Sequence, residues 1–291
     1  MKPPAQRIKV AILDTGLDPA IPAIEAHKKC IQRKKGWPLT DKGEEMVPAD
    51  TDGHGTHVTG LLLRMAPDCD VYVAKIANKE GKPISPARVA EAIDHAVNVW
   101  KVDIISMSFG FTDEREQGHQ KLREAINKAH AMGVLMFAGA SNTGAHAAPV
   151  PGPAFPARHS NVFCIYAGDA MGNSSRINPT ARTDDYNFLA LGEAVKSGWP
   201  GKSPYSMRMS GTSVSTPIVA GLAASFLRYA YWKMPDNAPR CKEFEKMQKW
   251  LFHVSTRRNG YDVLSLSTFF RDESNEEREI FLQKLVEGRL P

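Results

Sequence analysis

Four polar side chains have the types that nucleophilic chemistry at a serine requires, and they occur in the order Asp14, His54, Asn142 and Ser213. A serine hydroxyl is a weak nucleophile at neutral pH, so it needs a base within hydrogen-bond reach, and histidine has a suitable pKa. A carboxylate can hold that histidine in one tautomer, and an amide can donate a hydrogen bond to an oxyanion. The set predicts serine chemistry if the fold brings the four together.

Asp14 ends the apolar segment Val10–Leu13 and is followed closely by a turn glycine, Gly16. Ligands of open α/β sheets gather at the carboxyl ends of strands, which is where this carboxylate falls. The simpler alternative is that Asp14 only caps a turn or a helix.

His54 lies between Gly53 and Gly55, at the start of a helix predicted from the apolar spacing of Val58 to Met65. The glycines allow other backbone or a substrate to come close. Because residues three apart share a helix face, His54 and His57 could instead bind a metal ion, but the usual third ligand and a glutamate general base are missing. We therefore expect no metal site and a structural, hydrogen-bonded role for His57.

Ser213 stands at the N-terminus of an apolar helix predicted over 218–229, where free N–H groups and the helix dipole favour developing negative charge. Pro217 has no N–H to donate to the Ser213 carbonyl, so we expect an irregular first turn. The alternative is an ordinary helix cap. Asn142 follows the segment Phe137–Ala140 and could donate to an oxyanion or only finish a turn.

Short segments rich in β-forming residues recur through the first two thirds of the chain, and most are continuously apolar, which indicates central parallel strands. Between them lie helical patterns, one from Val89 to Trp100 opened by Ser85 and Pro86, another from Leu122 to Ala129 before Gly133. The alternation predicts an α/β fold of three layers, with a mostly parallel central β-sheet and helices on both faces. The predicted strands are 8–13, 71–76, 104–108, 134–138, 162–167 and 188–191.

The length of 291 residues suits one large α/β unit. We expect a single domain over 1–291, with a core over about 8–230 and a helical C-terminal extension over about 233–291. In the extension, the apolar spacing of Phe244 to Leu251 predicts an outer helix, and a capping box of Ser274 with Glu277 predicts a last one.

The net charge of +5 is spread along the chain, and its one short cluster, between Lys28 and Lys35, is typical of a solvated loop. We therefore expect no nucleic-acid partner. No apolar run approaches the ~18 residues that span a bilayer, so we expect no membrane association. The four cysteines lack metal-ligand spacing; they could form two disulfides, but buried thiols are the simpler interpretation.

Over about residues 8–230 the chain resembles the subtilisin-like serine peptidases, the subtilases. The resemblance rests on Val10–Gly16, Asp52–Gly60 and Ser210–Pro217, of which the last two are highly specific, together with Phe137–Asn142. It implies the family's α/β fold and its peptidase activity.

Residue by residue, the resemblance implies a catalytic triad of Asp14, His54 and Ser213, with Asn142 and the Ser213 backbone N–H as the oxyanion hole. It also implies that the end of one strand pairs with an extended peptide, and that a second segment lines the other side of the primary pocket. The residues so assigned are Ser108, Phe109, Gly110, Ala138, Gly139 and Ala140.

Two small residues depart from the family pattern: Ser141 stands where glycine is usual and Ser215 where alanine is usual. We expect activity to survive both.

Between Gly60 and Val71 there is no room for the loop that carries a tight calcium site in secreted relatives, so we predict no cofactor, with weaker calcium sites left open. The family's inhibitory propeptide is not in this chain. A separate propeptide or a protein inhibitor therefore stays open as a partner. The missing calcium loop, the missing signal peptide and the unpatterned cysteines favour an intracellular enzyme, with earlier removal of an N-terminal segment as the alternative.

The leading hypothesis is a serine endopeptidase that cleaves extended polypeptides through an acyl-enzyme. The main alternative is a catalytically silent peptide-binding or regulatory domain with the same fold, and a third is an esterase that uses the same triad. The sequence leaves the cleavage preference and the physiological substrate open.

Overall fold

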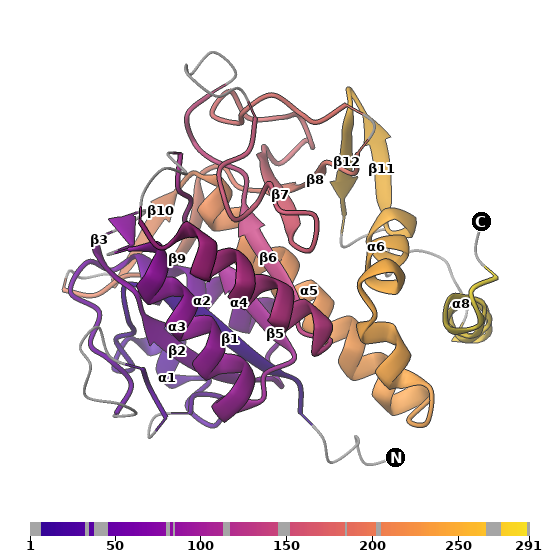
Figure 1. Cartoon of the computed structure of the whole chain (residues 1–291), viewed down its shortest axis with the longest axis horizontal. Helices are drawn as coiled ribbons and strands as arrows, with labels where there is room; N and C mark the ends of the chain where they lie inside the picture. The colour runs from indigo at the N-terminus through magenta and orange to yellow at the C-terminus, as the bar shows by residue number, and fades with distance from the viewer. Residues whose placement is uncertain are drawn as a thin grey trace.

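A central sheet of eight strands has the order β11-β12-β8-β7-β6-β5-β1-β2 (Figure 1). Every neighbouring pair is parallel except β11 and β12. The prediction of an α/β fold with a mostly parallel sheet is therefore confirmed. The strands are β1 (Lys9–Asp14), β2 (Asp70–Lys75), β5 (Ile104–Met107), β6 (Leu135–Gly139), β7 (Phe163–Gly168), β8 (Phe188–Leu191), β11 (Ser255–Arg258) and β12 (Tyr261–Leu264). The computed structural model describes residues 7–32, 35–37, 46–79, 82–83, 85–112, 117–144, 152–183, 185–201, 205–265 and 275–289.

All six predicted strands are present, with ends that differ by at most one residue. Successive side chains of a strand point to opposite faces, and in β1 both faces are buried: Val10 and Ile12 join one core cluster, while Ala11 and Leu13 join another. Burial on both sides explains why these segments are continuously apolar.

Helices cover the two faces of the sheet, which makes the three predicted layers. One face packs against α2 (His54–Met65) and α5 (Thr212–Lys233), which also contact each other. The other face packs against α3 (Pro86–His95), the π-helix η1 (Ala96–Trp100) and α4 (His119–Ala131). Figure 1 shows α3 and α4 in front of the strands, with α2 and α5 behind them.

The predicted helix boundaries on this second face are confirmed. Ser85 caps α3, since its Oγ accepts a hydrogen bond from the Arg88 N–H at 3.2 Å, and Pro86 occupies the first turn. At the other boundary, α4 ends before Gly133, whose φ of +72° is in the left-handed region that favours glycine.

The C-terminal extension contains the helices that the sequence predicts, but also a hairpin that it does not. The helices are α6 (Phe244–His253) and α8 (Asn275–Glu287), preceded by the 3₁₀ turn η2 (Ala238–Lys242). The hairpin is β11 and β12, which joins the central sheet through β8. Its strands lack an apolar run, because β11 is a polar edge strand and β12 buries an aspartate that pairs with Arg257. Ser274 of the predicted capping box lies outside the described residues.

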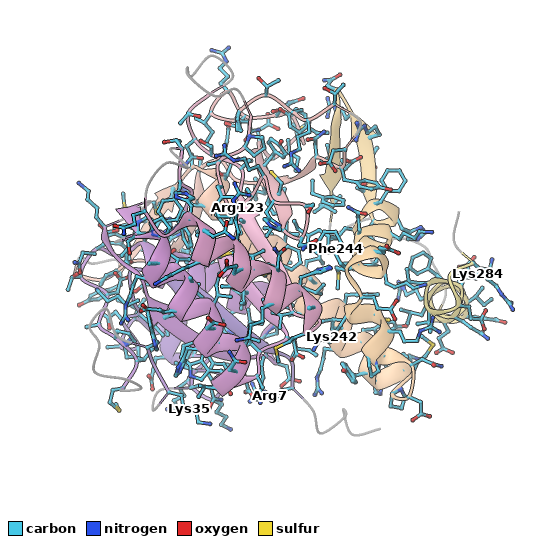
Figure 2. The ribbon with its side chains drawn as sticks, viewed as in Figure 1. Arg7, Lys35, Arg123, Lys242, Phe244 and Lys284 are labelled. Atoms are coloured by element: carbon cyan, nitrogen blue, oxygen red, sulfur yellow. The ribbon has the colours of Figure 1, made fainter. Side chains whose placement is uncertain are left out.

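Aromatic stacking joins the extension to the core. Phe244, which Figure 2 labels, stacks on Phe163 of β7 with ring centroids 4.3 Å apart. Trp250 stacks on Phe226 of α5 at 4.0 Å. The Lys242 side chain pairs with Asp103 at the start of β5.

Smaller elements complete the described chain. They are α1 (Pro22–Glu25) and the hairpins β3 (Ala77–Lys79) with β4 (Lys82–Pro83) and β9 (Val195–Gly198) with β10 (Ser206–Met209). All four cysteines are buried free thiols, as expected. Within the ranges described above, no helix has both the length and the apolar character that a membrane span needs.

Candidate active site

Asp14 and His54 are in direct contact at the carboxyl end of β1. His54 Nδ1 lies 2.7 Å from Asp14 Oδ1, and the Thr15 N–H donates to the same oxygen at 2.8 Å. When Nδ1 donates to a carboxylate oxygen, Nε2 is left as the acceptor nitrogen of the ring. The geometry of the pair therefore suits the tautomer that a histidine base requires.

The glycines around His54 are required by close contacts. A Cβ on Gly55 would lie 2.2 Å from the Gly16 carbonyl oxygen, and a Cβ on Gly53 would lie 2.5 Å from the Trp199 ring. Gly53 also has a φ of +115°, which places it in the left-handed region. Only glycine at these positions lets α2 begin against Gly16, which follows β1, and beside the Trp199 ring.

The His57 ring points toward the β9–β10 hairpin. Its Nε2 lies 3.1 Å from the Val195 carbonyl oxygen and 3.2 Å from that of Met207. Burial lowers the pKa of His57 to about 4, against hydrogen bonds to those carbonyls that raise it, so the ring is neutral and donates. The two histidines thus face different partners, and within the described ranges no group of three or more His, Cys, Asp or Glu side chains is arranged to hold a metal ion.

Ser213 and Asn142 meet at Gly211. A Cβ on Gly211 would lie 2.9 Å from Ser213 Oγ and 3.0 Å from Asn142 Nδ2, so the hydroxyl and the amide face one point in space. Ser213 is 5% exposed, and its Oγ makes no hydrogen bond to any other described residue. The arrangement leaves a hydroxyl and an amide donor together at the N-terminus of α5.

The Asn142 side chain is oriented by Thr212. Its Oδ1 accepts hydrogen bonds from the Thr212 N–H at 2.8 Å and the Thr212 hydroxyl at 3.1 Å, so the donor nitrogen points the other way. The preceding Ser141 has a φ of +151°, a conformation that a side chain rarely adopts. This explains why glycine suits that position.

The strand register places the Asp14–His54 pair and the Ser213–Asn142 pair near the carboxyl ends of the same strands. In β1 and β5, Leu13 pairs with Met107, so Asp14 and Ser108 are the next residues on neighbouring strands. The Ser108 hydroxyl in turn donates to the Ser213 carbonyl at 2.9 Å. Because adjacent strands are only ~4.8 Å apart, the Asp14–His54 pair at the end of β1 lies near Ser108 at the end of β5, which contacts the start of α5.

A cavity of about 210 Å³ lies beside Ser213. It includes the three predicted residues at the end of β5 and Gly139, whereas the Ala138 and Ala140 side chains are buried in the core on the α3 and α4 face. Among the described residues that line it, no side chain is charged. They are Ser108, Phe109, Gly110, Thr112, Gly139, Ser141, Asn142, Thr143, Ala154, Thr212 and Ser213.

Two buried charged residues at the site were not predicted from the sequence. The Asp50 carboxylate accepts hydrogen bonds from both sides of His54, and Lys75 Nζ donates to the Thr15 and Ala49 carbonyls at 2.7 and 2.8 Å. Burial lowers the pKa of Lys75, while nearby carboxylates oppose that shift. The only sequence signal was a lysine that ends a buried apolar strand; Asp50 lies in a polar segment and has no signal of its own.

The mostly parallel sheet, with an aspartate–histidine pair at one strand end and a serine at the start of the covering helix, defines a subtilisin-like α/β protein. The chain belongs to the subtilase family: the family model, described as Subtilase family, matches residues 5–267. The relatives that follow are named as proteases, two of them as serine proteases.

The sequence relatives share about a third of their aligned residues with this chain. A thermostable alkaline protease of Halalkalibacterium halodurans is 36% identical over 184 residues, which are 60% of this chain and 47% of that protein. An intracellular serine protease of Paenibacillus polymyxa is 31% identical over 226 residues, 75% of this chain and 65% of that protein. The major intracellular serine protease of Bacillus subtilis is 30% identical over 233 residues, 77% and 69%. The chain thus spans about half of the length of the first relative and about two thirds of the length of the other two.

Two solved structures share the fold over nearly the whole chain. The prenylagaramide maturation protease PagA superposes with a TM-score of 0.69 at 24% identity, covering 94% of this chain and 93% of that one. A mutant of the protease domain of PatA superposes with a TM-score of 0.70 at 24% identity, covering 97% and 96%. At this identity the likeness concerns the fold alone.

Proposed function

We propose that the chain is a serine endopeptidase that hydrolyses peptide bonds of extended polypeptides through an acyl-enzyme. The observation that carries the proposal is the 2.7 Å contact between His54 Nδ1 and Asp14 Oδ1, at the sheet edge that also holds the buried Ser213 hydroxyl. Membership of a family of proteases supports polypeptides as the substrate class.

Each side chain has a role that its contacts support. Ser213 Oγ attacks the substrate carbonyl while His54 Nε2 takes its proton and then delivers that proton to the leaving amine. Asp14 holds the tautomer and stabilises the imidazolium that forms. Water, activated by the same histidine, then hydrolyses the acyl-enzyme and returns the proton to Ser213.

The oxyanion of the tetrahedral intermediate is stabilised by Asn142 Nδ2 and the Ser213 N–H. The fixed orientation of the amide against Thr212 supports this role, because a preorganised donor needs no rearrangement when charge develops. The N-terminal position of Ser213 in α5 adds the favourable end of the helix dipole.

The substrate lies as an extended strand along the end of β5, pairing with the backbone of Ser108 to Gly110. Its side chain before the scissile bond enters the cavity of about 210 Å³ beside Ser213. The backbone of Ala138 to Ala140 forms the opposite wall, with Gly139 in the cavity lining.

We also propose that residues 1–291 form one domain, with a core over about 8–230 and the extension over about 233–291. The parallel pairing of β12 with β8 supports this division, because the extension then completes the central sheet instead of forming a separate unit.

A fluorophosphonate probe tests the proposal, because it forms a covalent bond only with an activated serine. We expect the wild-type chain to be labelled and to cleave a peptide library, and Ser213→Ala to do neither. The matched control is Ser215→Ala, which removes a hydroxyl two residues away in the same turn and should still be labelled. An unlabelled wild-type chain that binds peptides without releasing products would instead establish the silent binding domain.

A further inference from the structure

The Asp50 carboxylate gathers five hydrogen bonds in a nearly closed environment, with only 8% of the residue exposed. Oδ1 accepts from the Thr15 hydroxyl at 2.9 Å and from the N–H groups of Asp52 and Gly53 at 3.1 and 2.8 Å. Oδ2 accepts from the Thr56 N–H at 2.8 Å and its hydroxyl at 2.7 Å. Five donors on two oxygens is about the full accepting capacity of an ionised carboxylate.

Asp50 caps the N-terminus of α2, although it lies outside the helix. The N-cap residue Gly53 has no side chain, and Asp50 satisfies N–H groups on both sides of His54. Burial alone raises the pKa of the Asp50 carboxyl, but hydrogen bonds from Thr56, Gly53 and Thr15 outweigh it and hold the pKa below its usual value. The group is therefore ionised where the helix dipole favours a negative charge.

The same carboxylate reaches the strand that carries Asp14. Thr15 donates its hydroxyl to Asp50 and accepts from the Gly55 N–H at 2.8 Å, while its own N–H donates to Asp14 Oδ1 at 2.8 Å. The residue after Asp14 and the residues around His54 are thus connected to one buried anion. The Asp14–His54 pair is thus held on one side by Thr15 and on the other by the residues around His54, and Asp50 bonds to both.

We propose that Asp50 is a positioning residue that sets the orientation of the His54 ring relative to Asp14. The proposal rests on the proposed function, since it concerns how that histidine is aimed at Ser213. Asp50 itself contacts no substrate and transfers no proton. A shift of about 1 Å in a positioned group can cost ~10²-fold in rate, which sets the size of the expected effect.

The test compares two isosteric substitutions. Asp50→Asn keeps the shape but replaces one accepting oxygen by a donor that faces other donors, so we expect kcat per fluorophosphonate-labelled site to fall about 10- to 100-fold with KM within about twofold. The control, Asp103→Asn, acts at the opposite end of the sheet, where Oδ2 of the buried Asp103 accepts from the Lys9 N–H at 2.8 Å. It should leave kcat per labelled site within about twofold of wild type.

A spectroscopic measurement separates positioning from folding. The His54 Nδ1 proton, hydrogen-bonded to Asp14, should give a low-field proton resonance that Asp50→Asn shifts or loses and Asp103→Asn keeps. If Asp50→Asn does not fold, the buried Thr15 gives a second pair of variants. Thr15→Val removes the hydroxyl link and should lower kcat about tenfold, whereas Thr15→Ser keeps the hydroxyl and should restore it.

The outcomes are distinguishable. A wild-type chain that is neither labelled nor active overturns the proposed function. A labelled, active wild type whose Asp50→Asn form has the wild-type kcat and the wild-type low-field resonance overturns only the role of Asp50. Equal losses of kcat per labelled site in Asp50→Asn and Asp103→Asn also overturn that role, because they indicate a general effect on folding.

Discussion

The hydroxyl of Ser108, at the end of β5, donates a 2.9 Å hydrogen bond to the backbone carbonyl of Ser213 in the first turn of α5. In a regular helix that carbonyl would accept from the residue four positions on, but that residue is Pro217, which has no N–H. A side chain from the neighbouring strand thus replaces the missing helical bond. The contact joins the strand proposed to bind substrate to the helix that carries the proposed nucleophile.

Ser108→Ala should therefore affect both stability and rate. It leaves a buried carbonyl without a donor, which costs about 1–3 kcal/mol in the free energy of unfolding, and it frees the Ser213 backbone to move. We expect urea unfolding to show this loss and kcat/KM to fall about tenfold. Ser108→Thr, which keeps the hydroxyl, should retain the rate better than Ser108→Ala; equal rates in the two variants would contradict the link.

Asn142→Asp tests the oxyanion donor with little change of shape. The aspartate keeps an oxygen to accept from Thr212 but lacks the Nδ2 donor and adds a negative charge near a developing anion. Removing one donor of an oxyanion hole typically costs ~10²–10³ in kcat, and if Asn142 has that role we expect at least that loss here, with KM little changed. A kcat within threefold of wild type would remove Asn142 from the mechanism.

The sequence predicts the elements whose residues are determined locally. The six core strands are continuously apolar because both faces of the sheet are covered. Motifs such as Gly53–Gly55 are specific because close contacts with the Trp199 ring and the Gly16 backbone leave no room for a side chain. The sequence does not predict the hairpin β11–β12. Its buried Asp262 pairs with the nearby Arg257 but also accepts from the Asn187 N–H, 75 residues away along the chain. Asp50 escapes prediction for the same reason, since one of its partners is Thr15.

The lowered pKa of His57 should make the free energy of unfolding fall in acid. Its pKa is lowered by burial to about 4 in the folded chain and is near ~6.5 when exposed, so the unfolded chain binds the extra proton between these values. Stability is complete above the unfolded pKa and falls as the pH drops toward 4, by about 3 kcal/mol. Urea unfolding from pH 7 to 4 should show this loss in wild type and a loss smaller by about that amount in His57→Gln. Parallel curves for the two proteins would exclude His57 as the source.

Lys75→Met should destabilise the edge of the sheet beside Asp14. The methionine keeps the apolar stem, but the Thr15 and Ala49 carbonyls lose the ammonium that now donates to both. We expect the free energy of unfolding to fall by about 2–4 kcal/mol. The exposed Lys79→Met, four residues along the chain, is the control and should change it by less than about 0.5 kcal/mol.

The cavity beside Ser213 predicts which side chains precede the cleaved bond. Its described lining is uncharged, and an unpaired charge is costly to bury, so substrates with an uncharged residue at that position should have the higher kcat/KM. Gly110→Ala should narrow the cavity, because a Cβ there would lie 2.6 Å from the Ala154 Cβ on the facing wall. We expect the ratio of kcat/KM for phenylalanine over alanine substrates to fall at least about tenfold.

Gly221→Ala is the matched control for that change in specificity. It forces a contact of the same length, 2.6 Å to the Met65 Cβ, but at the packing of α5 on α2 and away from the cavity. Both variants should lose stability, since overpacking typically costs about 1–3 kcal/mol, yet only Gly110→Ala should change the ratio between the two substrates. An unchanged ratio in Gly110→Ala would mean that the substrate side chain does not enter this cavity.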